Sequence, residues 1–364
     1  MLVTNFNRHY WIIDALDEAV DRGPFDEYFS LLSKIDENIP LKVFITSRPS
    51  QALDNLFPRL PTITESVTPD DSLADIRLYV ETSSATLPVY GIEERQSLVK
   101  NLVEKSGGSF PWTALVMKQL RDVVTVEEVH VVLENVPQKM SELYYSNIKK
   151  MESSRTKNLA KHVITWTICS VHRLTGDQMK DAIKLSLDIT MVRDLRTSLQ
   201  YLCGQFLDVD KQSHIQVVHE TARAFLTMGT LDSELRIDVP VGHQMIAMAC
   251  LKYLLGDNLK YSKRRRSGAA VTSKTSMADY ASLRFSEHIV RATSSSDKLF
   301  EMLEKFFNTN VLLWIECVAQ LKSLGCLIRT SRHLSSYLAR RSKHVLVIPG
   351  DLAAWVVDLP RIVT

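Results

Sequence analysis

Two stretches near the start of the chain decide the fold: YWIIDALDE at residues 10–18 and LKVFITSRP at residues 41–49. Each is a short apolar run that ends in charged or hydroxyl residues. This pattern is typical of a buried parallel strand whose carboxyl end opens onto a phosphate site. Residues 24–35, which lie between the two runs, have apolar side chains at helical spacing. We therefore expect a strand, a helix and a second strand parallel to the first.

Charged residues at the ends of these strands are candidate site residues. Asp14, Asp17 and Glu18 follow the first strand, where carboxylates bind Mg²⁺ and orient water during nucleoside triphosphate hydrolysis. Arg48 follows the second strand and could contact a terminal phosphate. The same residues also fit a solvated acidic turn before a helix, since carboxylates suit the helix dipole, and a surface arginine at a strand end.

The sequence has no glycine-rich loop that could hold phosphates. The pattern GxxxxGK(S/T) occurs nowhere in the 364 residues, and the neighbouring glycines 107 and 108 are followed by Ser109 without a lysine. Backbone N–H groups of such a loop, together with its lysine, provide most of the binding energy for a triphosphate. We therefore expect this polypeptide not to hydrolyse nucleotides by itself.

The pattern becomes helical after residue 65. A helix-start signal, PDDS at residues 69–72, opens a helical segment that ends near Pro137. Residues 138–232 then have the spacing of three main helices followed by two short alternating strands around a polar turn. Three helices and a β-hairpin predict a winged-helix domain. His219, at the end of its second strand, could donate to a phosphate of a neighbouring domain, or it could be a core or hinge histidine.

Residues 233–364 have mainly helical spacing, over roughly 241–255, 277–293, 297–307, 310–322, 326–342 and 350–363. We expect a loop at residues 256–276, which carry the basic run from Lys263 to Arg266. That run could be a nuclear import signal or a contact to a nucleic-acid backbone, or it could be a solvated charge run.

Composition and charge describe an ordinary globular chain. The sequence is 45% hydrophobic and 24% charged with a net charge of +2, so no overall field favours nucleic acid or membrane. Its five cysteines form no CxxC pair, which indicates reduced, buried thiols. We find neither a signal peptide nor an apolar run near the ~20 residues of a membrane helix. We therefore expect a soluble protein of the cytoplasm or the nucleus.

Taken together, these stretches resemble the NACHT-type STAND nucleoside triphosphatases of filamentous fungi, which are relatives of NOD-like receptors. The likeness follows the chain in order over residues 11–18, 43–49, 108–116, 136–144, 166–175, 202–204, 219–226, 280–288, 310–316 and 355–359.

The resemblance implies a mostly α chain with four parts. A truncated parallel α/β nucleotide-binding segment at residues 1–65 would be followed by a helical subdomain at 66–137. A winged-helix domain at 138–232 and a C-terminal helical region at 233–364 would complete the chain. A sheet with two of its usual strands is expected to expose edges and apolar faces.

The resemblance also implies roles for the candidate residues. Asp14 would lie near the Mg²⁺ shell, and Asp17 and Glu18 would orient the attacking water. Arg48 would sense the γ-phosphate, and His219 would hold ADP in the resting state. ATP or ADP and Mg²⁺ are the cofactors of the intact family, and we expect this chain alone to bind none of them.

The leading hypothesis is a truncated signalling protein that acts through protein–protein interaction, with other protein domains or like chains as partners and no membrane. A second hypothesis is an ATP-hydrolysing switch whose missing P-loop half is supplied elsewhere. The third is nucleic-acid binding by the winged helix. We rank it last, because winged helices of the resembled family pack against the nucleotide domain instead.

Overall fold

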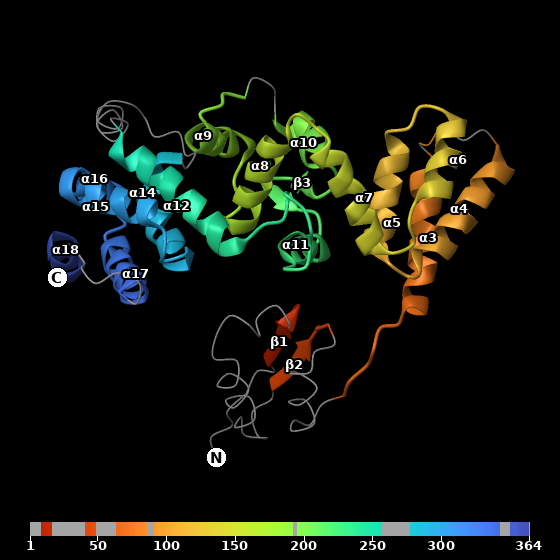
Figure 1. Cartoon of the computed structure of the whole chain (residues 1–364). Coiled ribbons are helices and arrows are strands. Elements are labelled where there is room, and N and C mark those ends of the chain that lie inside the picture. The colour runs from red at the N-terminus through yellow and green to blue at the C-terminus, as the bar shows by residue number, and fades with distance from the viewer. Residues whose placement is uncertain are drawn as a thin grey trace, which may run out of the picture. The chain divides into compact units, whose positions relative to one another are not determined.

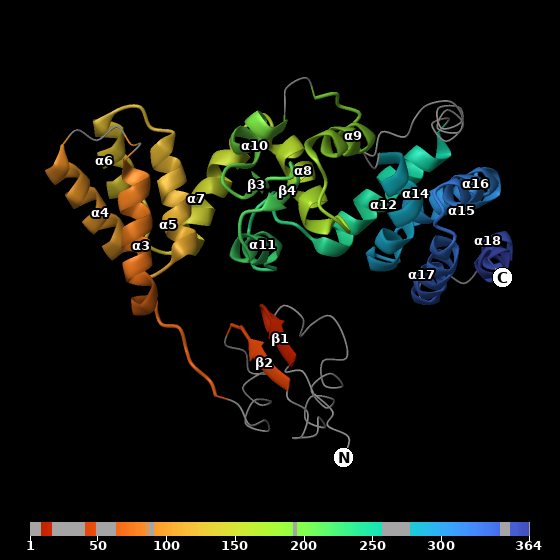
Figure 2. The same cartoon turned by 180° about the vertical axis from the view of Figure 1, so that it is seen from behind.

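The computed structural model describes residues 9–16, 41–48, 63–85, 87, 91–191, 195–256, 277–342 and 350–363. The chain divides into two compact units, Met1–Asp71 and Ser72–Thr364. Over the described residues the structure is mostly helical, as the sequence predicts, and the strands found there form two small sheets (Figures 1 and 2).

The first unit contains a parallel pair of strands, β1 (His9–Ile13) and β2 (Leu41–Ile45). Their register runs from His9 opposite Leu41 to Ile13 opposite Ile45, so the expected parallel pairing is confirmed. Several apolar side chains of the pair are exposed, among them Ile12 and Phe44, as expected of a sheet with few strands. The helix predicted at 24–35 lies outside the described residues.

Four helices form the helical subdomain, which lies in the second unit apart from the first turn of α3. They are α3 (Pro69–Ser84), α4 (Ile92–Ser106), α5 (Phe110–Arg121) and α6 (Val126–Asn135). Local signals set their ends. Asp71 accepts a hydrogen bond from the backbone of Thr68 at 2.7 Å, and Thr125 and Glu128 form a capping box at the start of α6. The indole of Trp112, fully buried, donates to the carbonyl of Pro137 at 2.7 Å and ties α5 to the exit of the subdomain.

The winged-helix domain follows, with α7 (Met140–Glu152), α8 (Lys157–Cys169), α9 (Gly176–Leu187), α10 (Leu195–Cys203), β3 (Leu207–Val209), β4 (Ile215–Val217) and α11 (Glu220–Thr227). The strands β3 and β4 are antiparallel, which confirms the predicted hairpin. A backbone bond from Ile215 to the carbonyl of Leu174 fastens the hairpin to the loop before α9 at 2.8 Å. That helix begins with a capping box of Thr175 and Gln178.

The C-terminal helical region contains α12 (Val239–Leu255), α14 (Met277–Arg291), α15 (Asp297–Thr309), α16 (Val311–Gln320), α17 (Gly325–Arg341), α18 (Gly350–Asp358) and the 3₁₀ turn η3 (Leu359–Ile362). The prediction of a single helix over residues 350–363 is wrong at its C-terminal end, because α18 ends at Asp358. Pro360 lacks an N–H and its ring clashes with the preceding turn, so the segment continues as a 3₁₀ turn. The basic run from Lys263 to Arg266 lies outside the described residues.

Helix α12 joins the winged helix to the region that follows. It packs against α8 and α9 on one side and against α14 and α15 on the other, and both views show it running between these groups (Figures 1 and 2). Within the part of the chain that the structure describes, no helix combines the length and apolar character needed to cross a bilayer.

Candidate functional site

The ends of β1 and β2 bring the candidate residue Asp14 together with Thr46 of the neighbouring strand end. The hydroxyl of Thr46 donates to a carboxylate oxygen of Asp14 and accepts from the backbone N–H of Ala15 at 3.0 Å. Backbone bonds extend the pairing, from Thr46 to the carbonyl of Ile13 and from Leu16 to the carbonyl of Thr46, each at 2.9 Å. The parallel register therefore holds the Asp14 carboxylate in place beside the end of the neighbouring strand.

Asp14 is exposed and has the chemistry of a Mg²⁺ ligand, since Mg²⁺ is often bound through one or two carboxylates and retains several waters. Arg48 lies beyond the end of β2, at the same edge of the sheet, and is also exposed. Asp17 and Glu18 lie outside the described residues. Among the residues that are described, no group of three or more His, Cys, Asp or Glu could hold a metal ion.

His219 stands at the N-terminus of α11 and caps that helix. Its Nδ1 accepts the backbone N–H of Thr221 at 3.2 Å and lies 2.8 Å from the Thr221 hydroxyl. That hydroxyl is in turn 3.0 Å from the phenol oxygen of Tyr144, whose pKa is raised by burial. Because Nδ1 accepts, a neutral His219 carries its proton on Nε2. The histidine is exposed, and its role in this structure is to cap α11.

Helix α10 and the β-hairpin of the winged helix carry few cations. Helix α10 contains one basic residue, Arg196, and the hairpin contains Asp208 and Asp210 together with Lys211. Backbone N–H groups of His214 and Gln212 donate to Asp210, and these bonds contribute to the lowered pKa of its carboxyl. Lys118 lies 4.0 Å from Asp208 and Arg173 lies 3.7 Å from Asp210, so the charges of the wing are balanced and do not form the basic surface that duplex binding needs.

A buried polar chain, which sequence reasoning did not identify, connects the winged helix to the C-terminal region. The backbone N–H of Val171 donates to the phenol oxygen of Tyr280 at 3.2 Å, and this oxygen is 2.8 Å from Nε2 of His288. Nδ1 of His288 is 2.9 Å from Nδ1 of His243. Histidines within otherwise apolar helix faces at 243 and 288 were the available signal, but a sequence does not show which of them meet.

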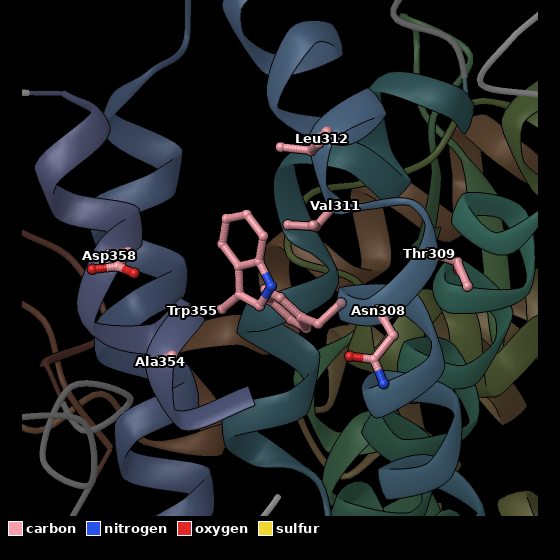
Figure 3. Close-up of a pocket in the computed structure, with 8 residues that line it drawn as sticks. Asn308, Thr309, Val311, Leu312, Ala354, Trp355 and Asp358 are labelled. Atoms are coloured by element: carbon pink, nitrogen blue, oxygen red, sulfur yellow. The ribbon is translucent and has the colours of Figure 1, made fainter. Parts of the chain in front are cut away.

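A cavity of about 330 Å³ lies where the corner between α15 and α16 faces α18. Trp355 projects from α18 toward this corner, with Val311 on the other side (Figure 3). The lining comprises Phe307, Asn308, Thr309, Val311, Leu312, Ala354, Trp355 and Asp358. These eight residues include no histidine, cysteine or cation. The cavity is therefore better suited to binding an apolar side chain than to catalysing a reaction.

Comparison with known proteins finds a family match in the middle of the chain. Residues 148–238 match the family model of the GPI inositol-deacylase winged helix domain. The matched segment runs from within α7 to the residue before α12 and includes the β-hairpin. The predicted winged-helix domain is therefore confirmed by both the fold and this similarity. No curated protein and no solved structure matches the chain.

Proposed function

We propose that this chain is part of a NACHT-type STAND signalling protein and acts through protein–protein interaction. The observation that carries this proposal is the firm attachment of the winged helix to the C-terminal helices. Signalling switches of this kind pass a change from one domain to the next by rigid-body motion of packed elements. A winged helix that is packed rigidly against its neighbour can transmit such a motion.

The attachment is close-packed along α8 and α12. A Cβ placed on Gly242 of α12 would lie 2.7 Å from the sulfur of Cys169 and 2.9 Å from the methyl of Thr165, both on α8. Only glycine permits this approach of the two helices without a shift. Within the winged helix, Arg223 of α11 donates to the carbonyl of Ile168 at 2.9 Å and so holds α8 against α11. The winged helix and α12 are therefore expected to move as one body.

The polar residues at the strand ends of the first unit support a relationship to nucleotide-dependent switch proteins. The Asp14–Thr46 pair stands at the carboxyl edge of parallel strands, the position that the resemblance assigns to the Mg²⁺ shell. Asp14 fits a metal ligand, but this polypeptide has no loop to hold phosphates, so the triphosphate itself does not fit the chain alone. ATP or ADP and Mg²⁺ would belong to the intact assembly.

Calorimetric titration of the whole chain with MgATP and MgADP tests this proposal. We expect no saturable binding at micromolar concentration. Micromolar binding that requires Mg²⁺ and is lost in Asp14→Asn would contradict the absence of independent nucleotide chemistry. Sedimentation of the chain over a range of concentrations tests the interaction function, because self-association would identify like chains as partners.

The Asp14–Thr46 contact favours a second candidate function. In it, this chain would be part of an ATPase whose P-loop is supplied by another polypeptide. Adding such a half and measuring phosphate release decides between the two. Turnover that is abolished by Asp17→Asn would support the ATPase. The wing carries balanced charge and gives nucleic-acid binding no particular support; salt-dependent binding to a DNA duplex would be the result that restores it.

A further inference from the structure

A second cavity lies between α3 and α4 in the helical subdomain. It measures about 630 Å³, within the usual range for sites that bind small molecules. Three of its lining side chains are cationic: Arg77 from α3, and Arg95 and Lys100 from α4. Two helices therefore direct positive charge toward one concave surface.

These cations are not neutralised by the ion pairs of the described residues. Glu81 and Glu104 also line the cavity, and each stands four residues after a lining cation, Arg77 and Lys100 respectively. Neither carboxylate forms an ion pair with these cations in the part of the chain that the structure describes. The cationic groups remain available to a ligand.

Arg95 provides an independent sign of a ligand. Its Nε is buried and has no hydrogen-bond partner among the described residues. A buried donor of a guanidinium without an acceptor is costly, since such hydrogen bonds are among the stronger ones in proteins. An anion in the cavity would supply that acceptor.

The rest of the lining is apolar or neutral. Val99 and Val103 are buried and form an apolar part of the lining, and the Ser84 side chain is buried beside them. Ile92 is 79% exposed, although an isoleucine at a cavity rim gains by being covered. The ligand that suits these surfaces has an apolar body as well as a charged group.

We propose that this cavity binds a small organic anion with one charged group, a phosphate or a carboxylate, attached to an apolar body. Arg95 and Arg77 would bind the charged group through their planar guanidinium forks. The valines and Ile92 would cover the apolar body. The two carboxylates of the lining would exclude ligands that carry more negative charge.

Calorimetric or NMR titration of the whole chain with phenyl phosphate, benzoate and benzamide tests the proposal. These probes share an apolar ring, and the first two distinguish a phosphate from a carboxylate ligand. We expect saturable binding of at least one anion with a Kd in the millimolar range or tighter, and much weaker binding of neutral benzamide. Arg95→Gln should weaken anion binding about tenfold or more.

Two further variants keep the result interpretable. Arg77→Gln changes an exposed lining residue and should also weaken anion binding. It replaces Arg95→Gln as the test if that variant does not fold. Arg121→Gln removes an exposed arginine from α5, outside the cavity, and should leave binding unchanged. The proposal is overturned if neither anion binds below about 10 mM, if benzamide binds equally well, or if Arg121→Gln weakens binding as much as the lining variants.

Discussion

The Nδ1 atoms of His243 and His288 lie 2.9 Å apart, and both side chains are buried between α12 and α14. One of these nitrogens must donate and the other must accept, so the pair is satisfied when both rings are neutral. Tyr280 can donate to Nε2 of His288 while its oxygen accepts from Val171. His288 then carries its proton on Nδ1 and donates it to His243.

This pair should make stability depend on pH. Burial, together with the charge of Arg291, lowers the pKa of His243 to about 4 and that of His288 well below its usual value. The unfolded chain binds these protons near pH 6.5. The stabilisation is therefore present above about pH 6.5 and is lost as the pH falls toward 4. We expect the free energy of unfolding to fall by about 1 to 2 kcal/mol or more between pH 7.5 and pH 5.

Urea unfolding followed by circular dichroism at the two pH values measures this difference. His243→Gln should flatten the dependence, whereas His130→Asn, a change at an exposed histidine of α6, should not. An equally steep dependence in His243→Gln would show that other groups cause it.

Gly242→Ala should loosen the joint between the winged helix and α12. The added methyl would lie 2.7 Å from the sulfur of Cys169, so the helices must move apart at a cost of about 1 to 3 kcal/mol. Thermal unfolding measures the loss. Gly229→Ala serves as the control, because a Cβ there meets nothing within 4 Å. The double variant Gly242→Ala/Cys169→Ser should recover part of the loss, and no recovery would argue against the sulfur contact.

All five cysteines should be inert in the folded chain. Each is a buried free thiol, and burial raises the pKa of Cys169 to about 12 and those of Cys203 and Cys250 higher still. Since the thiolate is the reactive form, alkylation should be slow without denaturant and complete in concentrated urea. Mass spectrometry after a short treatment with iodoacetamide measures the modification. Rapid labelling of Cys203 in native buffer would contradict its burial.

The apolar face of the two-stranded sheet should promote self-association. Ile12 and Phe44 are directly opposite each other and are 77% and 63% exposed. Replacing both residues by threonine, which also favours strands, removes exposed apolar surface from the sheet. We expect lower light scattering at high protein concentration. Tyr201→Thr, which alters an exposed aromatic of α10, is the matched control and should have a smaller effect.

Local patterns account for most of the secondary structure. Apolar spacing predicts the helices of residues 69–187, and capping residues such as Thr125 and Thr175 fix where two of them begin. The parallel pairing of β1 and β2 follows from their apolar runs and the intervening crossover. The candidate residues Asp14, Arg48 and His219 could also be selected from sequence, because each stands at the end of a strand.

Tertiary structure alone decided the rest. The sequence itself determined where helices and strands form, since these depend on residues a few positions apart. It does not show that His243 meets His288, that Gly242 lies against Cys169, or that Arg77 and Arg95 line one cavity. Those relationships depend on the angle and distance at which whole helices pack, and packing is set by the combined shape of many side chains.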